Sequence, residues 1–260
     1  MRTALRLLLP PTLAEAKIRA RSELLSTSLT ARLKRPVHVE VPTDYADMEA
    51  RILAGKAELA WLPPLVCARS LPSLRAIFRT VRRGASSFRS AIVVRAGEVA
   101  NIEALAGKRA AWADSMSLGG HLLALDYLRS RGLMPRRLFS SQRFYGSYRA
   151  AVGALVTGEA DVSAVAVTGP DEAAVRAQLT DLVGGAQRKL AALAYSAESP
   201  NDAFVITKAV LDADFDELVD RLFPPSDKFR ATSVLLDALD AEGVVRTEPR
   251  EYQPLILLAR

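Results

Sequence analysis

The sequence predicts an α/β protein, because short apolar runs typical of buried strands alternate with helical patterns along nearly the whole chain. The chain has 260 residues, of which 50% are hydrophobic, and this is enough for one large domain or two of ordinary size. The alternation is typical of mostly parallel sheets flanked by helices. No repeat of fixed period and no long linker interrupts it.

The first third of the chain shows the alternation clearly. A long helix is expected over 13–33, where Leu25, Leu29 and Leu33 fall four residues apart on one face and Pro36 ends the pattern. The other elements expected here are strands over 3–9, 37–41, 58–62 and 74–81, and helices over 45–54 and 66–71.

The rest of the chain continues the pattern with shorter elements. The β-branched run Ile92-Val93-Val94 is the clearest strand signal. The expected strands are 90–95, 109–113, 162–167, 190–194 and 204–207, and the expected helices are 121–131, 150–157, 171–179, 215–222 and 228–239.

The charge pattern argues against a nucleic-acid partner. The net charge is +6 and the pI about 9.7, but the basic residues are scattered and no basic run is interleaved with aromatics. A basic balance does suit an anionic ligand. Cys67 lies in an Ala/Leu/Val setting typical of a buried thiol, and with His38 and His121 distant in sequence no metal site or cofactor is predicted.

The apolar run Ala4–Leu9 is too short for a membrane span or a signal-peptide core, and it predicts a buried first strand. No membrane span is therefore expected. The compartment depends on the native start: extracytoplasmic if a signal peptide has been removed, cytoplasmic if Met1 is the true start. Both alternatives stay open, and a monomer is expected.

Four polar loops follow strands or open helices, where ligands of open α/β sheets bind. Ser and Gly at a helix N-terminus leave backbone N–H groups and the positive end of the helix dipole for an anion. Ser, Thr and Asp are also ordinary N-caps, so only the set of loops together suggests a site. The loops are 42–45, 86–89, 114–120 and 146–148.

Eight segments, in order, carry a resemblance to a known family. They are Arg35-Pro36-Val37, Thr43-Asp44-Tyr45, Gly55–Pro64, Ser87–Arg95, Leu105–Arg109, Gly146-Ser147, Gly158–Val162 and Ser199–Phe204. With these, the chain resembles the substrate-binding proteins of phosphate/phosphite/phosphonate-type ABC transporters, which have the type 2 periplasmic-binding-protein fold. The resemblance extends from about Leu5 to about Leu222.

The resemblance implies two lobes, each a mostly parallel sheet flanked by helices, joined by two crossing strands. One lobe would combine 1–91 with 197–260, and the other would span 92–196, with a ligand cleft between them and closure by a hinge motion. The implied function is capture of a small anionic or organic ligand, for delivery to an ABC permease and without chemistry of its own. The alternative is a cytoplasmic enzyme or ligand-sensing protein on the same fold, although no acid–base pair is evident.

The resemblance also indicates ligand contacts, with departures. The family's ligand loop usually has further Ser or Thr where Leu118 and Gly119 stand, His where Tyr148 stands and Tyr where Phe88 stands. Fewer hydrogen-bonding groups then remain for a tetrahedral oxyanion, whose burial requires many donors. The expected ligand-binding residues are Tyr45, Ser117, Gly119, Gly120 and Tyr148, followed by Ser147, Ser87, Asp202 and His121.

Overall fold

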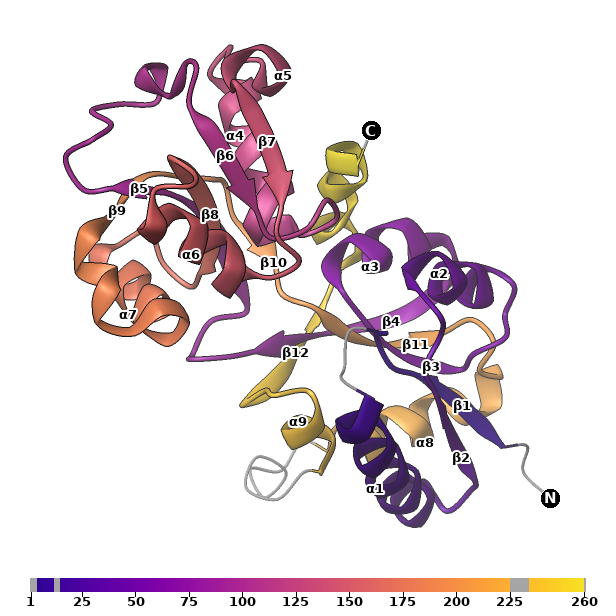
Figure 1. Cartoon of the computed structure of the whole chain (residues 1–260). Coiled ribbons are helices and arrows are strands. Elements are labelled where there is room, and N and C mark those ends of the chain that lie inside the picture. Colours follow the sequence, from indigo (N-terminus) through magenta and orange to yellow (C-terminus); the bar gives the residue numbers. More distant parts are fainter. Residues whose placement is uncertain (1–3, 12–14, 225–233, 260) are drawn as a thin grey trace. The chain divides into compact units, whose positions relative to one another are not determined.

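The computed structural model describes residues 4–11, 15–224 and 234–259, and the side chains of 15–21 and 259 are outside this description. The chain divides into two compact units, shown in Figure 1. The first unit comprises Met1–Ser86 and Pro200–Ile256, and the second comprises Ser87–Ser199 and Leu257–Arg260. Each unit contains one sheet with helices on both faces, which confirms the α/β expectation.

The sheet of the first unit has the strand order β12-β4-β11-β3-β1-β2. β1 pairs in parallel with β2 and β3, whereas β11 is antiparallel to β3 and β4, and β12 is antiparallel to β4. The strands are β1 (Leu5–Leu8), β2 (Val37–Glu40), β3 (Leu59–Leu62), β4 (Leu74–Val81), β11 (Ala203–Thr207) and β12 (Gly243–Thr247).

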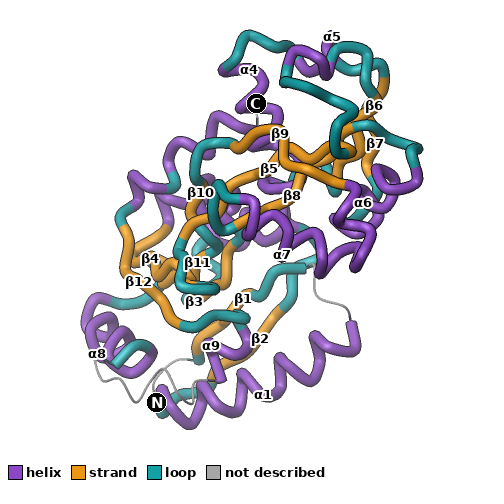
Figure 2. The backbone as a smooth tube through the Cα atoms, turned by 90° about the vertical axis from the view of Figure 1, so that its left-hand side faces the viewer, coloured by secondary structure: helices purple, strands orange, loops and turns teal. Residues whose placement is uncertain are grey.

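Helices cover both faces of this first sheet, as Figures 1 and 2 show. On one face, Leu25, Leu29 and Leu33 of α1 pack with α8 and α9 against alternate strand residues, so the predicted helical stripe is a core face. The helices are α1 (Glu15–Leu33), α8 (Asp212–Leu222) and α9 (Val234–Ala238) on that face, and α2 (Tyr45–Leu53) and α3 (Pro64–Ser70) on the other.

The sheet of the second unit has the order β10-β5-β8-β6-β7, with β9 also paired to β5. Strand β5 is antiparallel to β8 and β9, and β6 is parallel to β7 and β8. The strands are β5 (Ser87–Arg95), β6 (Arg109–Trp112), β7 (Ser141–Phe144), β8 (Val162–Val167), β9 (Leu190–Tyr195) and β10 (Ser199–Pro200).

Residues of β5 alternate between two cores, as the period of a strand requires. Ile92 and Val94 pack with α4 and α5, while Ala91 and Val93 pack with α6 and α7. The helices of this unit are α4 (Leu123–Ser130), preceded by a π-helical turn over Leu118–Leu122, α5 (Pro135–Leu138), α6 (Tyr148–Thr157) and α7 (Glu172–Val183).

The sheets are mixed rather than mostly parallel, and this corrects the expectation from alternation. In the first unit, β11 enters the sheet between β3 and β4 in the opposite direction, because the chain returns there from the second unit. Periodicity reports which face of a strand is buried but not the direction in which the strand runs.

Two strands, the short helix α5 and one helix start were missed. The sequence pattern overlooked β7, whose four residues are all exposed, and the edge strand β12, because neither has an alternating apolar face. The helix expected from His121 begins at Leu118, since Gly119 and Gly120 are weak helix formers that mask its first turn. Of the helix expected over 228–239, residues 228–233 lie outside the described residues and α9 occupies 234–238.

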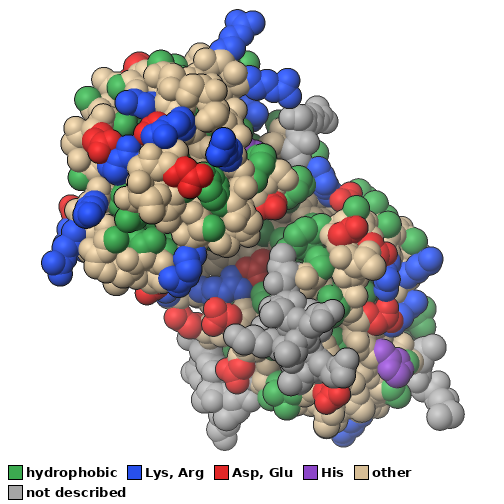
Figure 3. All heavy atoms as spheres, in the orientation of Figure 1, with side chains coloured by type: hydrophobic (Ala, Val, Ile, Leu, Met, Phe, Trp, Pro, Cys, Tyr) green, Lys and Arg blue, Asp and Glu red, His purple; other side chains and the backbone are tan. Residues whose placement is uncertain are grey.

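Other expectations concern isolated residues and surface charge. Cys67 is buried, and burial raises the pKa of its thiol, as expected for a structural residue. No described helix is both long and apolar enough to cross a membrane. On the face drawn in Figure 3, basic side chains are interspersed with acidic ones.

Asp161 ties three strands of the second unit together. Its Oδ2 accepts hydrogen bonds from the backbone N–H and Nε of Arg109, both at 2.9 Å, and its Oδ1 accepts from Nη2 of Arg109 at 2.8 Å and Nη2 of Arg95 at 3.0 Å. These contacts join β5 and β6 to the segment that enters β8. The side-chain hydrogen bonds from Arg109 hold the pKa of Asp161 well below its usual range, although burial acts in the opposite direction.

We expect Asp161→Asn to lower the stability of the protein at neutral pH. A carboxyl group with a depressed folded-state pKa stabilises the fold above its unfolded-state pKa of about 3.9, and this contribution is lost as the pH falls through the folded-state pKa. The stability difference between wild type and variant should therefore be largest near pH 7 and shrink below about pH 4. Urea denaturation across pH measures it, with the exposed Glu172→Gln as control. A difference that does not change with pH would contradict this role of the charge.

Candidate functional site

The loop over 114–120 folds into a capped helix N-terminus in the second unit. Ser117 is the N-cap, and its Oγ accepts a hydrogen bond from the Gly120 N–H at 3.1 Å. Asp114 fixes the loop residues that precede the N-cap. Its Oδ1 accepts from the Met116 N–H at 2.8 Å, and its carbonyl accepts from the Ser117 N–H at 3.2 Å. The N–H groups of Leu118 and Gly119 belong to the first turn, which has no acceptors for them within the helix.

Gly119 and Gly120 are required by close packing. A Cβ on Gly119 would lie 2.6 Å from the Ala166 Cβ and 2.8 Å from the Tyr148 hydroxyl oxygen. A Cβ on Gly120 would lie 2.7 Å from the Ala113 Cβ and 2.9 Å from the Tyr148 Cε1. Both glycines are buried. The Tyr148 ring of α6 therefore lies directly against the first turn of the helix, at a distance that side chains at either position would prevent.

Tyr148 places its hydroxyl beside the N-cap. The oxygens of Tyr148 and Ser117 are 3.4 Å apart, longer than the usual 2.7–2.8 Å of a hydroxyl–hydroxyl hydrogen bond. Burial raises the pKa of Tyr148, which keeps the phenol protonated near neutral pH, although the hydrogen bond with Ser117 acts in the opposite direction. Two neutral hydroxyls thus lie beside the first turn of the helix.

Ser90 is a contributor that sequence reasoning missed. It is fully buried on β5, and its hydroxyl donates to the Gly119 carbonyl at 2.7 Å. Its backbone N–H donates to the Ser196 hydroxyl at 2.9 Å. The available signal was a Ser directly before the apolar run 91–94, because a buried hydroxyl requires a partner. Its role here is to fix the position of the first turn.

The remaining predicted residues at helix or strand starts have local roles. Ser147 caps α6, accepting from the Ala150 N–H at 3.2 Å, and is exposed. Tyr45 is the half-buried first residue of α2, whose N-cap is Asp44. Ser87 begins β5 and is half-buried. Their contact with a ligand stays a prediction.

His121 packs among aromatic rings beneath the loop. Its ring centroid lies 5.5 Å from that of Trp112 and 5.0 Å from that of Phe144. Its Nδ1 lies 2.8 Å from the Ser115 carbonyl, which can only accept, so Nδ1 carries the proton. Burial lowers the pKa of this imidazole, so it is neutral at pH 7. The side chain thus supports the loop at Ser115, and its contact with a ligand also stays a prediction.

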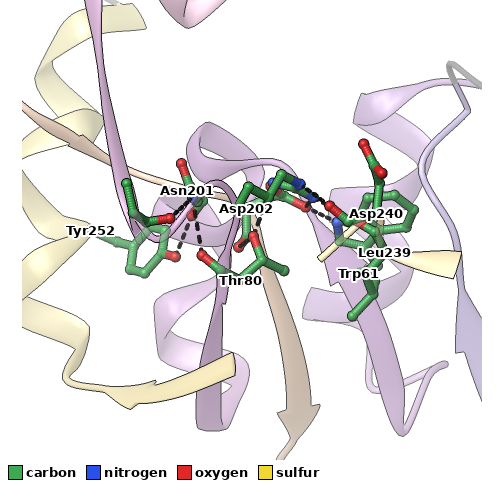
Figure 4. A network of polar contacts seen from close by, with 9 residues as sticks. Trp61, Thr80, Asn201, Asp202, Leu239, Asp240 and Tyr252 are labelled. Atoms are coloured by element: carbon green, nitrogen blue, oxygen red, sulfur yellow. Dashed lines mark hydrogen bonds and ion pairs between the residues drawn. The ribbon is translucent and has the colours of Figure 1, made fainter. Parts of the chain in front are cut away.

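Asp202 lies in the first unit, within the network of polar contacts in Figure 4. Its carboxylate binds the Arg82 guanidinium through both oxygens, with Nη2 donating to Oδ2 at 2.9 Å and Nη1 to Oδ1. It also accepts from Trp61 Nε1 and, at 3.2 Å, from the Thr80 hydroxyl. Burial opposes the charge of Arg82, but the hydrogen bonds and charge of Asp202 outweigh it and raise the pKa of Arg82.

The same network fixes the segments that leave and re-enter the first unit. Arg82 Nη2 donates to the Leu239 carbonyl at 2.6 Å and Nε to the Asp240 carbonyl at 2.7 Å. The buried Asn201 amide donates to the carbonyls of Thr80 and Ala85 at 3.0 and 3.1 Å. Because these partners occupy both oxygens of Asp202, the structure gives this carboxylate a role in holding the fold.

A pocket of about 350 Å³ in the first unit is lined by Arg6, Glu40, Asp47, Arg51 and Lys56. Two of its cations are already paired. Arg6 donates to Glu58 at 2.8 Å, and Arg51 to Glu40 and Asp47, both at 2.9 Å. The acidic partners of these two arginines therefore reduce the positive charge that the pocket could offer to an anion.

Comparison with known proteins identifies a family for this chain. The family model of phosphonate ABC transporter periplasmic substrate-binding proteins matches residues 7–252. The solved structure of chloride-bound XAC2383 from Xanthomonas citri is similar, with a TM-score of 0.78, 17% identity and coverage of 98% of this chain and 97% of that one. Methylphosphonate-bound PhnD1 from Prochlorococcus marinus gives a TM-score of 0.70, 18% identity and coverage of 99% and 97%.

A further solved structure has the same fold. It is a binding-protein component of an ABC phosphonate transporter from Pseudomonas aeruginosa, with a TM-score of 0.70, 16% identity and coverage of 98% of this chain and 85% of that one. At these identities the likeness establishes the fold, and it confirms the periplasmic-binding-protein architecture expected from the sequence.

We expect Gly119→Ala to destabilise the second unit by about 1–3 kcal/mol, because the added methyl would overlap Ala166 and Tyr148. Gly153→Ala is the matched control. Gly153 lies in α6 with no atom within 4 Å of its added Cβ, so this change should stabilise by about 0.5–1 kcal/mol. Thermal and urea denaturation measure both. If the two changes altered the stability equally, the result would contradict the close packing around Gly119.

We expect Asp202→Asn to destabilise the first unit by about 3 kcal/mol, because it leaves the partly buried Arg82 charge without its counterion. Asp212→Asn removes the partner of Arg75 from an exposed position of the same unit and should cost far less. Urea denaturation of the two variants measures the contrast. A loss for Asp202→Asn as small as that for Asp212→Asn would show that Asp202 is not the anchor of the network.

Proposed function

Because the chain belongs to the family of periplasmic substrate-binding proteins of phosphonate ABC transporters, we propose that it captures a small anionic solute at the Ser117–Gly120 turn. The family is one of solute-binding proteins that serve ABC transporters, and it is not a class of enzymes. Delivery of the solute to the permease of such a transporter is part of the proposal.

The observation that carries the proposal is the convergence of donors at one helix N-terminus. The hydroxyls of Ser117 and Tyr148 lie 3.4 Å apart beside the first-turn N–H groups of Leu118 and Gly119. Such an arrangement favours a negative charge through hydrogen bonds and the helix dipole. The Ser90 hydroxyl holds the Gly119 carbonyl, so the donors keep their positions when no ligand is bound.

The ligands of similar proteins support an anion. XAC2383 has been solved with chloride and with ATP, and PhnD1 with methylphosphonate. All three ligands carry negative charge, although they differ greatly in size. Their shared negative charge therefore supports an anionic solute for this chain. The uncharged part of the solute would be selected by the residues around the turn.

The sequence resemblance adds a second part to the proposal, namely that the solute is held between the two units. Tyr45 from the first unit and Ser87, Ser147 and His121 from the second are the further contacts that we propose on this basis. For Asp202 we propose an indirect contribution, through the Arg82 network that fixes the segments linking the units.

The test is the binding of small anions to wild type and to Ser117→Ala by isothermal titration calorimetry. The panel is chloride, phosphate, methylphosphonate and acetate. We expect at least one of them to bind, and Ser117→Ala to weaken that binding by about tenfold, since one hydrogen bond to an ionised group contributes about 1.5 kcal/mol. Ser115→Ala, an exposed position in the same loop, should leave affinity unchanged.

If Ser117→Ala and Ser115→Ala weaken anion binding equally, or if neither weakens it, the result would count against the turn as the binding site. Because the Ser117 hydroxyl also caps the helix, the stability of each variant is measured alongside, and we expect a loss of about 1 kcal/mol for Ser117→Ala. No binding by any anion of the panel would overturn the proposal of an anionic solute.

A further inference from the structure

The positive net charge of the chain comes from one segment of the second unit. Six of the 35 basic residues and none of the 29 acidic ones lie in 127–158, between Asp126 and Glu159. This segment therefore accounts for the whole net charge of +6, and the rest of the chain is balanced. A solvated protein surface usually mixes both signs of charge, so the segment differs from an ordinary polar surface.

Four of these six residues gather on a compact turn at the end of α4. The Gly132 N–H donates to the Arg129 carbonyl and the Arg137 N–H to the Met134 carbonyl, both at 2.9 Å. We call residues 129–137 the arginine turn. In Figure 3, drawn in the orientation of Figure 1, Lys and Arg side chains project from the end of the second unit at which α5 lies. The exposed arginines of the turn are Arg129, Arg131, Arg136 and Arg137.

The arginines of this turn are not engaged in ion pairs within the described part of the chain. Arg129, Arg136 and Arg137 have none, and the guanidinium carbon of Arg131 lies 5.2 Å from the centre of the Tyr127 ring. The negative end of the helix dipole favours Arg129 and Arg131 at the end of α4. It does not explain the pair in α5, which is a single helical turn. These charges are therefore available to a partner.

An exposed apolar side chain lies between the two pairs of arginines. Met134 is 58% exposed, directly before the buried Pro135. Transfer of such a flexible apolar side chain out of water is favourable. An apolar side chain flanked by positive charges is typical of a segment that binds a membrane surface. There the apolar group enters between the lipid headgroups, and the guanidinium groups stay with the phosphates.

From these observations we propose that the arginine turn docks on the surface of a bilayer that contains anionic phospholipids. The headgroup phosphates bind the guanidinium groups, and Met134 enters between the headgroups. A lipid surface fits better than an acidic protein. A protein partner must hold four long exposed side chains in one geometry at a cost in entropy, whereas mobile headgroups follow them.

The arginine turn lies at the opposite end of a helix from the Ser117–Gly120 turn. The π-helical turn and α4 together span residues 118–130, which at 1.5 Å per residue is about 20 Å. Membrane docking is therefore separate from solute capture, and the inference goes beyond the proposed function. Its effect is to concentrate the protein at a membrane, where the transporters served by its family lie.

The experiment measures co-sedimentation of the full chain with vesicles, in the absence of any solute. The vesicles contain phosphatidylcholine alone or phosphatidylcholine mixed with phosphatidylglycerol, and each kind is used at low and at high salt. The variants are Met134→Gln and the double substitution Arg136→Gln with Arg137→Gln. Circular dichroism confirms that each variant is folded.

The matched control is the double substitution Arg188→Gln with Lys189→Gln. It also removes an exposed, adjacent basic pair from the second unit, so the change in net charge is the same. This pair ends the 3-10 helix Gly184–Lys189, which follows α7. α7 packs on the opposite face of the sheet from α4 and α5, so the control pair is remote from the arginine turn.

We expect wild type to bind the phosphatidylglycerol vesicles at least about tenfold more tightly than the neutral ones, with the difference lost at high salt. Loss of Arg136 and Arg137 should weaken this binding roughly 25-fold, since each arginine near an anionic surface contributes about fivefold. Met134→Gln should weaken it roughly fivefold without changing its dependence on salt. The control should change it less than about twofold.

Several outcomes would overturn the proposal. Equal binding to both kinds of vesicle, or binding to neither, would exclude an anionic lipid surface as the partner. An equal loss in the two double variants would show that net charge, and not the arginine turn, accounts for binding. If soluble polyglutamate binds through Arg136 and Arg137 while the vesicles do not, the turn is a docking surface for an acidic protein instead.

Two further results concern the single residues and the proposed function. If Met134→Gln binds as wild type does, the entry of Met134 between headgroups is wrong. If the Arg136 and Arg137 double variant does not fold, the two single variants give the same comparison at about fivefold each, against Arg188→Gln. Because no solute is present, failure of membrane docking leaves the proposal of solute capture untouched.

Discussion

The contact between the Tyr148 ring and the two glycines of the helix start is the constraint on which the candidate site depends. It requires small residues at positions 113, 119, 120 and 166. A Cβ on Gly119 would overlap Ala166, and a Cβ on Gly120 would overlap Ala113. It also explains why a helix begins with two poor helix formers. The loss of helix propensity at Gly119 and Gly120 is accepted because nothing larger fits between β8 and α6.

The second unit holds this contact through its buried sheet. Ser90 on β5 bonds the Gly119 carbonyl, and Ala166 on β8 backs the same residue, so two neighbouring strands fix one turn. His121, one residue beyond the glycines, bonds the Ser115 carbonyl and packs among aromatic rings. The loop before the helix is thus held at both of its ends by buried groups, which is the condition for donors that keep their geometry without a ligand.

The sequence allowed the fold class and the polar loop over 114–120 at a helix start to be predicted, since alternating apolar runs and Ser/Gly helix starts are local patterns. It did not reveal the direction of β11 or the edge strands β7 and β12, because strand direction and edge pairing depend on distant segments. For Asp202 the sequence suggested a ligand contact, whereas the Arg82 partnership seen in the structure depends on residues 120 positions apart. The hydrogen bond from Ser90 to the Gly119 carbonyl could likewise not be predicted, because it depends on β5 lying beside that turn.

The tight packing at Gly119 also constrains the order in which this site can change during evolution. A hydroxyl-bearing side chain at position 119, which would add a donor to the turn, cannot be accepted while the large ring at position 148 is in place. A smaller residue at position 148 would not be enough, because the Ala166 Cβ lies nearer still, at 2.6 Å from the Cβ that position 119 would gain. A larger residue at position 119 therefore requires positions 148 and 166 to change with it, because the three residues share one contact.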